Sequence, residues 1–138
     1  MKKILILLIL LPLISLSQNQ DTVSLKQSAI ISVVNWLSEV DKMNYQSSYD
    51  NADELIKNAL TNKEWNKTIN YARDPLGEII SRELKSSKYL TEIPGGPDGM
   101  YVMVQFETSF QNKKNSLETI TAKQGKDYKW IVAGYFIR

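Results

Sequence analysis

The apolar residues of this chain change their spacing once, at Gly77. Before Gly77 they recur every three or four positions, which is the period of an amphipathic helix. The clearest such run comprises Ile30, Val33, Val34, Leu37 and Val40. After Gly77 they alternate with polar residues, and β-branched and aromatic side chains dominate, as in β-strands. Helices followed by strands, rather than interleaved with them, predict an α+β fold whose helices cover one face of an antiparallel sheet.

Three helices are expected in the N-terminal half. The first begins at Ser24, where Ser24 and Gln27 form a capping-box pattern. The segment 45–60 is expected to form one or two short helices. A second capping-box pattern, T-x-x-E at 61–64, begins the last helix, and the segment Pro75–Gly77 stops it.

Four strands are expected after Gly77, separated by three short connections. The predicted strands span 78–93, 100–110, 117–123 and 128–137, and the connections are 94–99, 111–116 and 124–127. Connections this short join antiparallel neighbours, so the strands form a meander, curved around the helices. In the second strand the better candidate for the core face consists of Val102, Val104, Phe106, Thr108 and Phe110. The last strand is apolar on both faces, so we expect it to be central or covered on both sides.

The N-terminus has the three parts of a secretory signal peptide. Lys2 and Lys3 form the basic start, residues 4–14 form an apolar run, and Ser15 and Ser17 supply the small side chains before a cleavage site. The alternative is a membrane anchor, but a spanning helix needs about 20 apolar residues, which this run does not reach. The sequence therefore predicts cleavage after Ser17 and an exported protein, periplasmic or secreted, with no stable membrane anchor.

The remaining segment, residues 18–138, is expected to form a single domain held together by burial alone. The chain has no cysteine, which excludes disulfides and lipidation, and it shows no internal repeat or linker. Its formal net charge is +2, and the two surplus lysines, Lys2 and Lys3, lie in the predicted signal peptide. A neutral mature domain gives no electrostatic reason to expect a nucleic-acid partner.

Composition excludes several classes of chemistry. The chain has neither histidine nor cysteine, so catalytic triads built on these residues and the usual zinc, haem and iron–sulfur sites are excluded. No D-x-D-x-D-G pattern supports a calcium loop, and we expect no metal site and no cofactor. Gly95, Gly96 and Gly99 resemble a phosphate-binding loop only superficially, because the prolines around them predict a hairpin turn.

Arg82 and Glu118 lie in strands that are otherwise suited to burial. Arg82 shares its strand face with Ile80 and Leu84, so its guanidinium faces the core if they do. A buried arginine needs an anionic partner, which Glu118 or alternatively Glu107 would supply as an internal ion pair. The alternative is that both residues are exposed, and we favour it here because charged strand residues are mostly exposed.

Aromatic residues and a further arginine complete the candidate set. The side chains that could line a concave pocket between helices and sheet are Tyr45, Tyr49, Trp65, Tyr71, Tyr101 and Tyr135. The simpler interpretation assigns them to the core of a domain without disulfides. Arg73 is a third charged candidate, and the sequence leaves open whether it serves stability or recognition.

Two functions are compatible with these features. The leading hypothesis is a non-enzymatic exported module that binds a small apolar ligand or a protein partner through the concave side of its sheet. The competing hypothesis is an isomerase- or dehydratase-type enzyme in which a carboxylate held in an apolar cavity acts as general base. The candidate bases are Glu107, Glu118 and Asp74. A filled concave side would count against the enzyme and the small ligand, and would leave protein contact or a structural role.

An ordered series of short motifs resembles the domain-of-unknown-function 4019 family and covers essentially the whole chain after residue 17. The first pieces are W-L at 36–37, Asp41, Tyr45, Trp65, Arg73, P-L-G at 75–77 and R-E-L-K-S at 82–86. The later pieces are P-G-G-P-D-G-M-Y at 94–101, F-E-T-S-F at 106–110, E-T-I-T at 118–121 and W-I-V-A-G-Y-F-I-R at 130–138. The resemblance implies a small bacterial exported domain and carries no established activity or site. The order of helices and curved sheet is also similar to the cone-shaped folds of nuclear transport factor 2, ketosteroid isomerase and the cystatins.

Overall fold

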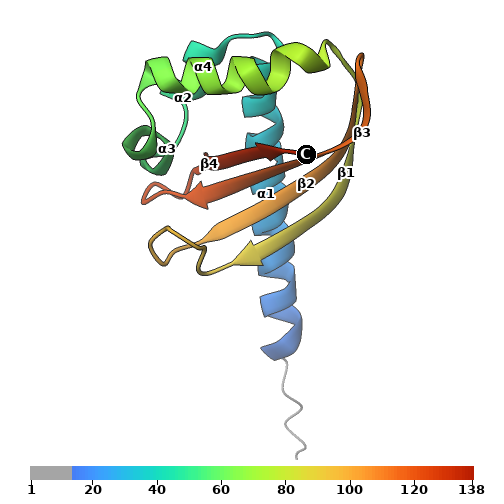
Figure 1. Cartoon of the computed structure of the whole chain (residues 1–138). Helices are drawn as coiled ribbons and strands as arrows, with labels where there is room; N and C mark the ends of the chain where they lie inside the picture. Colours follow the sequence, from blue (N-terminus) through green and yellow to red (C-terminus); the bar gives the residue numbers. More distant parts are fainter. Residues whose placement is uncertain (1–13) are drawn as a thin grey trace, which may run out of the picture.

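The computed structural model describes residues 14–138, which fold as helices packed against one face of a four-stranded antiparallel sheet (Figure 1). The helices are α1 (Ile14–Asp41), α2 (Tyr45–Asp50), α3 (Glu54–Ala59) and α4 (Asn62–Arg73), followed by a short 3-10 turn, η1 (Asp74–Leu76). The strands are β1 (Ile79–Leu90), β2 (Tyr101–Phe110), β3 (Lys113–Gln124) and β4 (Trp130–Ile137). The predicted α+β class and antiparallel meander are confirmed, with four α-helices rather than three. Most of the predicted signal peptide lies outside the described residues.

The later helices follow their sequence signals, but the first does not. α1 continues without interruption through Ser24, so the predicted start there is wrong. The capping box of α4 is confirmed, because Thr61 and Glu64 exchange side-chain to backbone hydrogen bonds of 2.7 and 3.3 Å. α4 then gives way to η1, after which Gly77 adopts a φ of 72°. None of the helices within 14–138 combines the length and the hydropathy needed to cross a bilayer.

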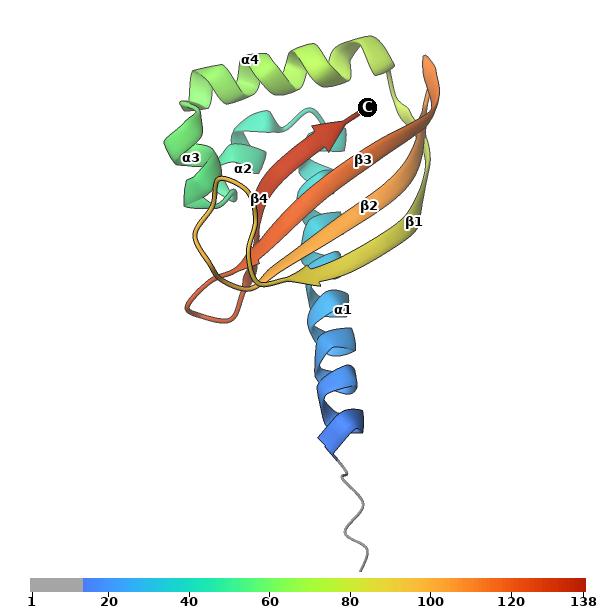
Figure 2. The same cartoon turned by 60° about the horizontal axis from the view of Figure 1, so that its bottom comes forward.

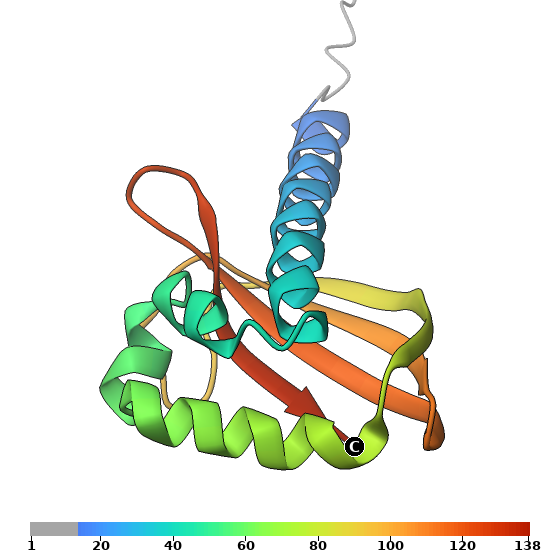
Figure 3. The same cartoon turned by 90° about the horizontal axis from the view of Figure 1, so that it is seen from above.

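α1 lies on the concave side of the curved sheet, and α4 crosses one end of the domain (Figures 2 and 3). α1 contacts all four strands, whereas α4 packs mainly on α2. The first turns of α1 extend past the sheet (Figure 1). The end of α1 near Asp41 and the end of α4 near Arg73 are thus the helix ends that meet the sheet.

The four strands pair in sequence order, so β1 and β4 are the edges of the sheet. Of the two alternatives predicted for the last strand, central or covered on both sides, the first is therefore wrong. The outer edge of β4 is instead partly covered by the α2–α3 connection, where the Asp53 amide donates to the Val132 carbonyl at 2.8 Å. A β-bulge leaves Ala133 without a partner in β3 and reverses the side-chain direction of the residues after it. Tyr135 consequently faces the same side as Trp130 and Val132, although strict alternation places it opposite them.

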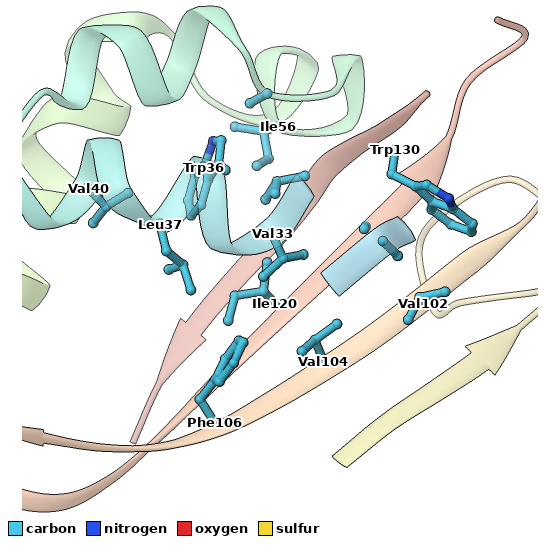
Figure 4. Packing of buried hydrophobic residues seen from close by; sticks show 14 of the residues in the cluster. Val33, Trp36, Leu37, Val40, Ile56, Val102, Val104, Phe106, Ile120 and Trp130 are labelled. Carbon is cyan, nitrogen blue, oxygen red and sulfur yellow. The ribbon is translucent and has the colours of Figure 1, made fainter. Parts of the chain in front are cut away.

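The core lies between α1 and the sheet (Figure 4). Val33, Leu37 and Val40 of α1 are buried and meet the inner face of β2. The predicted members of that face are all buried, which confirms the assignment: Val102, Val104, Phe106, Thr108 and Phe110. Tyr101 faces the other side of the sheet and is nevertheless buried, because the 94–99 turn folds over it and the Pro97 carbonyl accepts a hydrogen bond from its hydroxyl.

Candidate functional site

Six polar side chains from six elements converge at the end of the core where α1 and α4 terminate. We call them the polar cluster, and they are Asp41 of α1, Arg73 of α4, Arg82 of β1, Thr108 of β2, Glu118 of β3 and Tyr135 of β4. Two of them are cationic and two anionic, so their formal charges balance. A buried set of this kind is stable only if each charge has a partner, which the geometry below supplies.

Arg82 joins the two carboxylates of the polar cluster. Its Nη1 and Nη2 donate to the Asp41 Oδ2 and Oδ1 at 2.7 and 3.0 Å, and its Nε donates to the Glu118 Oε1 at 2.7 Å. The Arg82 side chain is 14% exposed and that of Glu118 is 0% exposed. The interpretation of both as exposed residues, which we favoured on sequence, is therefore wrong. Ile80 and Leu84 are themselves exposed, because β1 is an edge strand with a bulge at Ile80.

Glu118 has both carboxylate oxygens occupied by donors. Thr108 Oγ1 donates to its Oε1 at 2.6 Å, and the Tyr135 hydroxyl donates to its Oε2 at 2.6 Å. Arg82 bonds both oxygens as well, through its Nε and through an Nη2 that lies 3.3 Å from Oε2. The Glu118 carboxylate is thus used internally, by four hydrogen bonds.

Arg73 supplies the second positive charge. Its Nη2 donates to the Asp41 Oδ1 at 2.9 Å, and its Nη1 donates to the Tyr135 hydroxyl at 3.3 Å. Its guanidinium carbon lies 4.8 Å from the centre of the Phe110 ring, within the range of a cation–π contact. Arg73 therefore connects the end of α4 to the end of α1 and to β4. Its Nε has no partner among the described residues.

These contacts shift the pKa of Asp41, Arg82 and Tyr135. Burial raises the pKa of Asp41, but the hydrogen bonds and positive charges of Arg82 and Arg73 outweigh it and hold that pKa below its usual value. Burial lowers the pKa of Arg82, and its bonds to Asp41 and Glu118 more than reverse this. Burial and the charge of Glu118 raise the pKa of Tyr135 well above its usual value, so its hydroxyl stays protonated and donates at neutral pH.

The candidate aromatic residues do not share one pocket. Trp65 is buried, and its indole nitrogen donates to Ser48 Oγ at 3.0 Å. The Trp36 ring lies edge-on to Tyr135 with 5.5 Å between ring centres, which ties the polar cluster to the core. Tyr101 belongs to the opposite face of the sheet, as described above. Tyr71 is 84% exposed.

The remaining charged candidates lie outside the polar cluster. Glu107 is exposed and approaches Lys85 at 3.5 Å on the surface of the sheet, so it is not the partner of Arg82. Asp74 is exposed in η1. Sequence reasoning missed Asp41, because a polar residue at a helix end carries no signal of burial. It placed Thr108 on the core face but not among the candidate site residues.

A groove of about 700 Å³ lies at the outer edge of β4. Its walls come from α1, from the α2–α3 region and from the start of β4, and Figure 3 shows α1 and the β3–β4 hairpin on either side of α2. The residues that line the groove include Asn35, Trp36, Asp50, Asp53, Trp130 and Val132. A smaller hollow of about 290 Å³ adjoins Asp41 and Arg73 at the end of α1. Within 14–138, no group of three or more acidic side chains could hold a metal ion.

Comparison with known proteins identifies a family and nothing more specific. No curated protein and no solved structure gives a significant match. The family model described as "Protein of unknown function (DUF4019)" matches residues 32–135, a range that contains every member of the polar cluster. The chain therefore belongs to the DUF4019 family.

Proposed function

We propose that this chain is a bacterial exported, non-enzymatic module that binds a protein partner. Export is supported by the signal-peptide features of the N-terminus. The sheet curved around α1 also resembles the cone-shaped folds of nuclear transport factor 2 and its relatives. Such folds host binding proteins as well as enzymes. The choice of a protein as the partner rests on how the interior is filled and where the surface is open.

The concave side of the sheet is packed with side chains from the protein itself. Val33 and Leu37 of α1 are 0% exposed and face Val104 and Ile120 of the sheet, which are also 0% exposed (Figure 4). A small-molecule site needs a cavity of at least about 300 Å³ lined mainly by apolar groups. The space in which an apolar ligand would lie is the hydrophobic core, so the small-ligand version of the hypothesis loses its support.

The groove beside β4 is the observation that carries the proposal. It is open, and it mixes carboxylate, amide, hydroxyl and ammonium groups with the aromatic side chains of Trp36 and Trp130. Contact surfaces for other proteins are polar at the rim and enriched in aromatic residues, whereas small-molecule sites are more enclosed and more apolar. The groove thus fits a polypeptide better than a small apolar molecule.

The carboxylates do not support the enzyme hypothesis. A general base must lie within hydrogen-bond reach of a substrate proton. Glu118 uses both oxygens within the polar cluster, and Glu107 and Asp74 are exposed on the surface. None of the three has the environment that the base requires, an unoccupied carboxylate in an apolar cavity.

Photo-crosslinking in the producing cells tests the partner. A photoreactive benzoylphenylalanine in place of Asn35, an exposed residue of the groove wall, is expected to form adducts with a polypeptide. The matched control places the same group at Lys88, which is exposed on β1 at the other edge of the sheet. Adducts from position 35 but not from position 88, identified by mass spectrometry, support the proposal. Equal adducts from both positions, or none from position 35, contradict it.

Export is tested by sequencing the N-terminus of the protein recovered from its host. We expect the mature chain to begin at Gln18 and to lie in the periplasm or the medium. Replacing Ser17 by tryptophan should block cleavage, because the signal peptidase requires a small side chain there. An intact leader on wild-type protein in the cytoplasm would contradict export.

A further inference from the structure

The outer edge of β4 presents backbone groups to the groove. The Val132 carbonyl points away from β3, since it accepts a hydrogen bond from the Asp53 amide at 2.8 Å. Backbone groups two residues apart in a regular strand point the same way. Trp130 pairs with Gln124 in the regular part of β4, before the bulge at Ala133, so the N–H and C=O of Trp130 also point outward. Strand β4 therefore has one residue, Trp130, whose outward-pointing backbone groups lie beyond the part of the edge that the α2–α3 connection covers.

The α2–α3 connection already bonds to this edge of the sheet at one position. Ala52 forms a parallel bridge with Val132, and the chain then turns away into α3. An exposed strand edge with free N–H and C=O groups readily pairs with an added extended chain. The groove runs along the same stretch, because Lys129 and residues 130–132 of β4 form one of its walls.

The groove wall contains a carboxylate that lacks a cationic partner. Among the described residues, no lysine or arginine nitrogen lies within 4.0 Å of the Asp50 carboxylate, which accepts a hydrogen bond from the Gln46 side-chain amide at 2.8 Å. The Lys57 ammonium donates instead to the main-chain carbonyl of Asp50, at 3.0 Å. The other carboxylates of the wall each have a lysine nearby: Glu39 with Lys42, Asp53 with Lys123 and Glu54 with Lys57. The lining holds these four carboxylates against the two ammonium groups of Lys57 and Lys129, so a positive charge from outside is favoured there, and within the described part of the chain Asp50 is the carboxylate without an ion pair.

Two aromatic residues near the start of β4 have features that lower the stability of the domain on its own. The indole nitrogen of Trp130 is buried without a hydrogen-bond partner among the described residues. Tyr128, two residues earlier, adopts a left-handed backbone with a φ of 63° and is 81% exposed. Glycine and asparagine are favoured in that conformation, and no packing of the exposed ring offsets the strain. The Trp130 nitrogen lies inside the domain, and the left-handed Tyr128 closes the hairpin turn through its amide bond to the Gly125 carbonyl at 3.0 Å. The exposed Tyr128 ring is the apolar surface that a partner at this end of the strand would cover.

We infer that the groove binds a short extended peptide segment carrying a lysine or arginine, which adds to the outer edge of β4 at Trp130 and places its positive charge beside Asp50. This inference rests on the proposed protein-binding function and specifies how the partner is held. Main-chain hydrogen bonds to β4 would supply affinity, and the contact with Asp50 would select a basic side chain.

Three blocked five-residue peptides test the inference on the protein recovered from its host. The first alternates valine and lysine, the second replaces lysine by glutamate, and the third is the lysine peptide with its central amides N-methylated. Binding is measured by tryptophan fluorescence and by chemical-shift changes of backbone amides. We expect the lysine peptide to shift the amides of Trp130 and Asp53, and the other two peptides to bind about ten-fold more weakly.

Matched variants locate the charge contact. Asp50→Asn should weaken binding of the lysine peptide several-fold and leave binding of its N-methylated analogue unchanged. Glu83→Gln, at an exposed position of β1, should leave the binding of both peptides unchanged. Equal binding of the N-methylated and unmodified peptides, or shifts confined to β1, overturns the inference. If that result is obtained while position 35 still crosslinks to a polypeptide, the protein-binding function stands and the strand-addition mode fails. If position 35 gives no adduct either, both fail.

Discussion

Replacing Arg82 by alanine is expected to lower the free energy of unfolding by about 3–5 kcal/mol. The change leaves the Glu118 carboxylate, which is 0% exposed, with no positive charge in contact, and it leaves Asp41 with only Arg73. Removing one partner of a buried ion pair costs more than the pair contributes, because the remaining charge stays desolvated. Urea unfolding of wild type and variant at pH 7 measures the difference.

Two further variants separate the buried charge from a general effect of mutation. Lys85→Ala breaks the exposed contact with Glu107 and should change stability by less than about 1 kcal/mol. In Arg82→Ala combined with Glu118→Gln, the uncompensated charge is gone while an acceptor for Thr108 and a donor or acceptor for Tyr135 remain. That double variant should be more stable than Arg82→Ala alone. An Arg82→Ala protein as stable as wild type would show that the ion pair contributes nothing.

The pattern of the sequence predicts the layers of the fold because hydrophobic period depends only on local geometry. Val102, Val104 and Phe106 alternate along a regular strand, and the structure buries all three. The same rule fails for Tyr135, because one bulged residue at Ala133 shifts every later side chain to the other face. A bulge has no reliable signature in a single sequence. The direction of Tyr135 therefore could not be predicted, although the existence of its strand could.

The polar cluster was only partly predictable for a related reason. Arg82 and Glu118 attract notice because they are charged residues in strands, so their pairing could be proposed as an alternative. Asp41 lies at a predicted helix end, where acidic residues are ordinarily solvated, and only the tertiary arrangement brings it to two arginines. Burial of a charge depends on elements distant in sequence, and the strand period contains no information about them.

The polar cluster and the groove both include residues of α1, but these residues have different roles. Asp41 holds the end of α1 to β1 and α4, while Asn35, about two turns earlier, forms part of the groove wall. Fixing the end of α1 fixes the position of that wall relative to β4. A variant that weakens the polar cluster is thus expected to change the groove and the stability of the domain together, whereas Asp50→Asn changes a residue of the groove alone.

Replacing Asp41 by asparagine is expected to remove stability that depends on pH. The pKa of Asp41 is lowered from 3.8 in the folded protein, because Arg82 and Arg73 stabilise its charged form more than burial opposes it. A group with a depressed folded pKa contributes stability that is fully present above its unfolded pKa and is lost as the pH falls through the folded value. The wild type should therefore exceed Asp41→Asn by a constant amount, about 2 kcal/mol or more, between about pH 5 and 8.

Below about pH 4 the difference between wild type and Asp41→Asn should shrink, since Asp41 then takes up a proton and resembles the neutral asparagine. Urea unfolding at a series of pH values measures this. Glu83→Gln is the control, because Glu83 is exposed. The free energy of unfolding of this variant should change with pH in parallel with that of wild type throughout. A difference that stays constant down to pH 2, or that grows in acid, would mean that Asp41 is not held in its charged form by the two arginines. The stability of the polar cluster would then have to come from packing alone, through contacts such as Arg73 against Phe110.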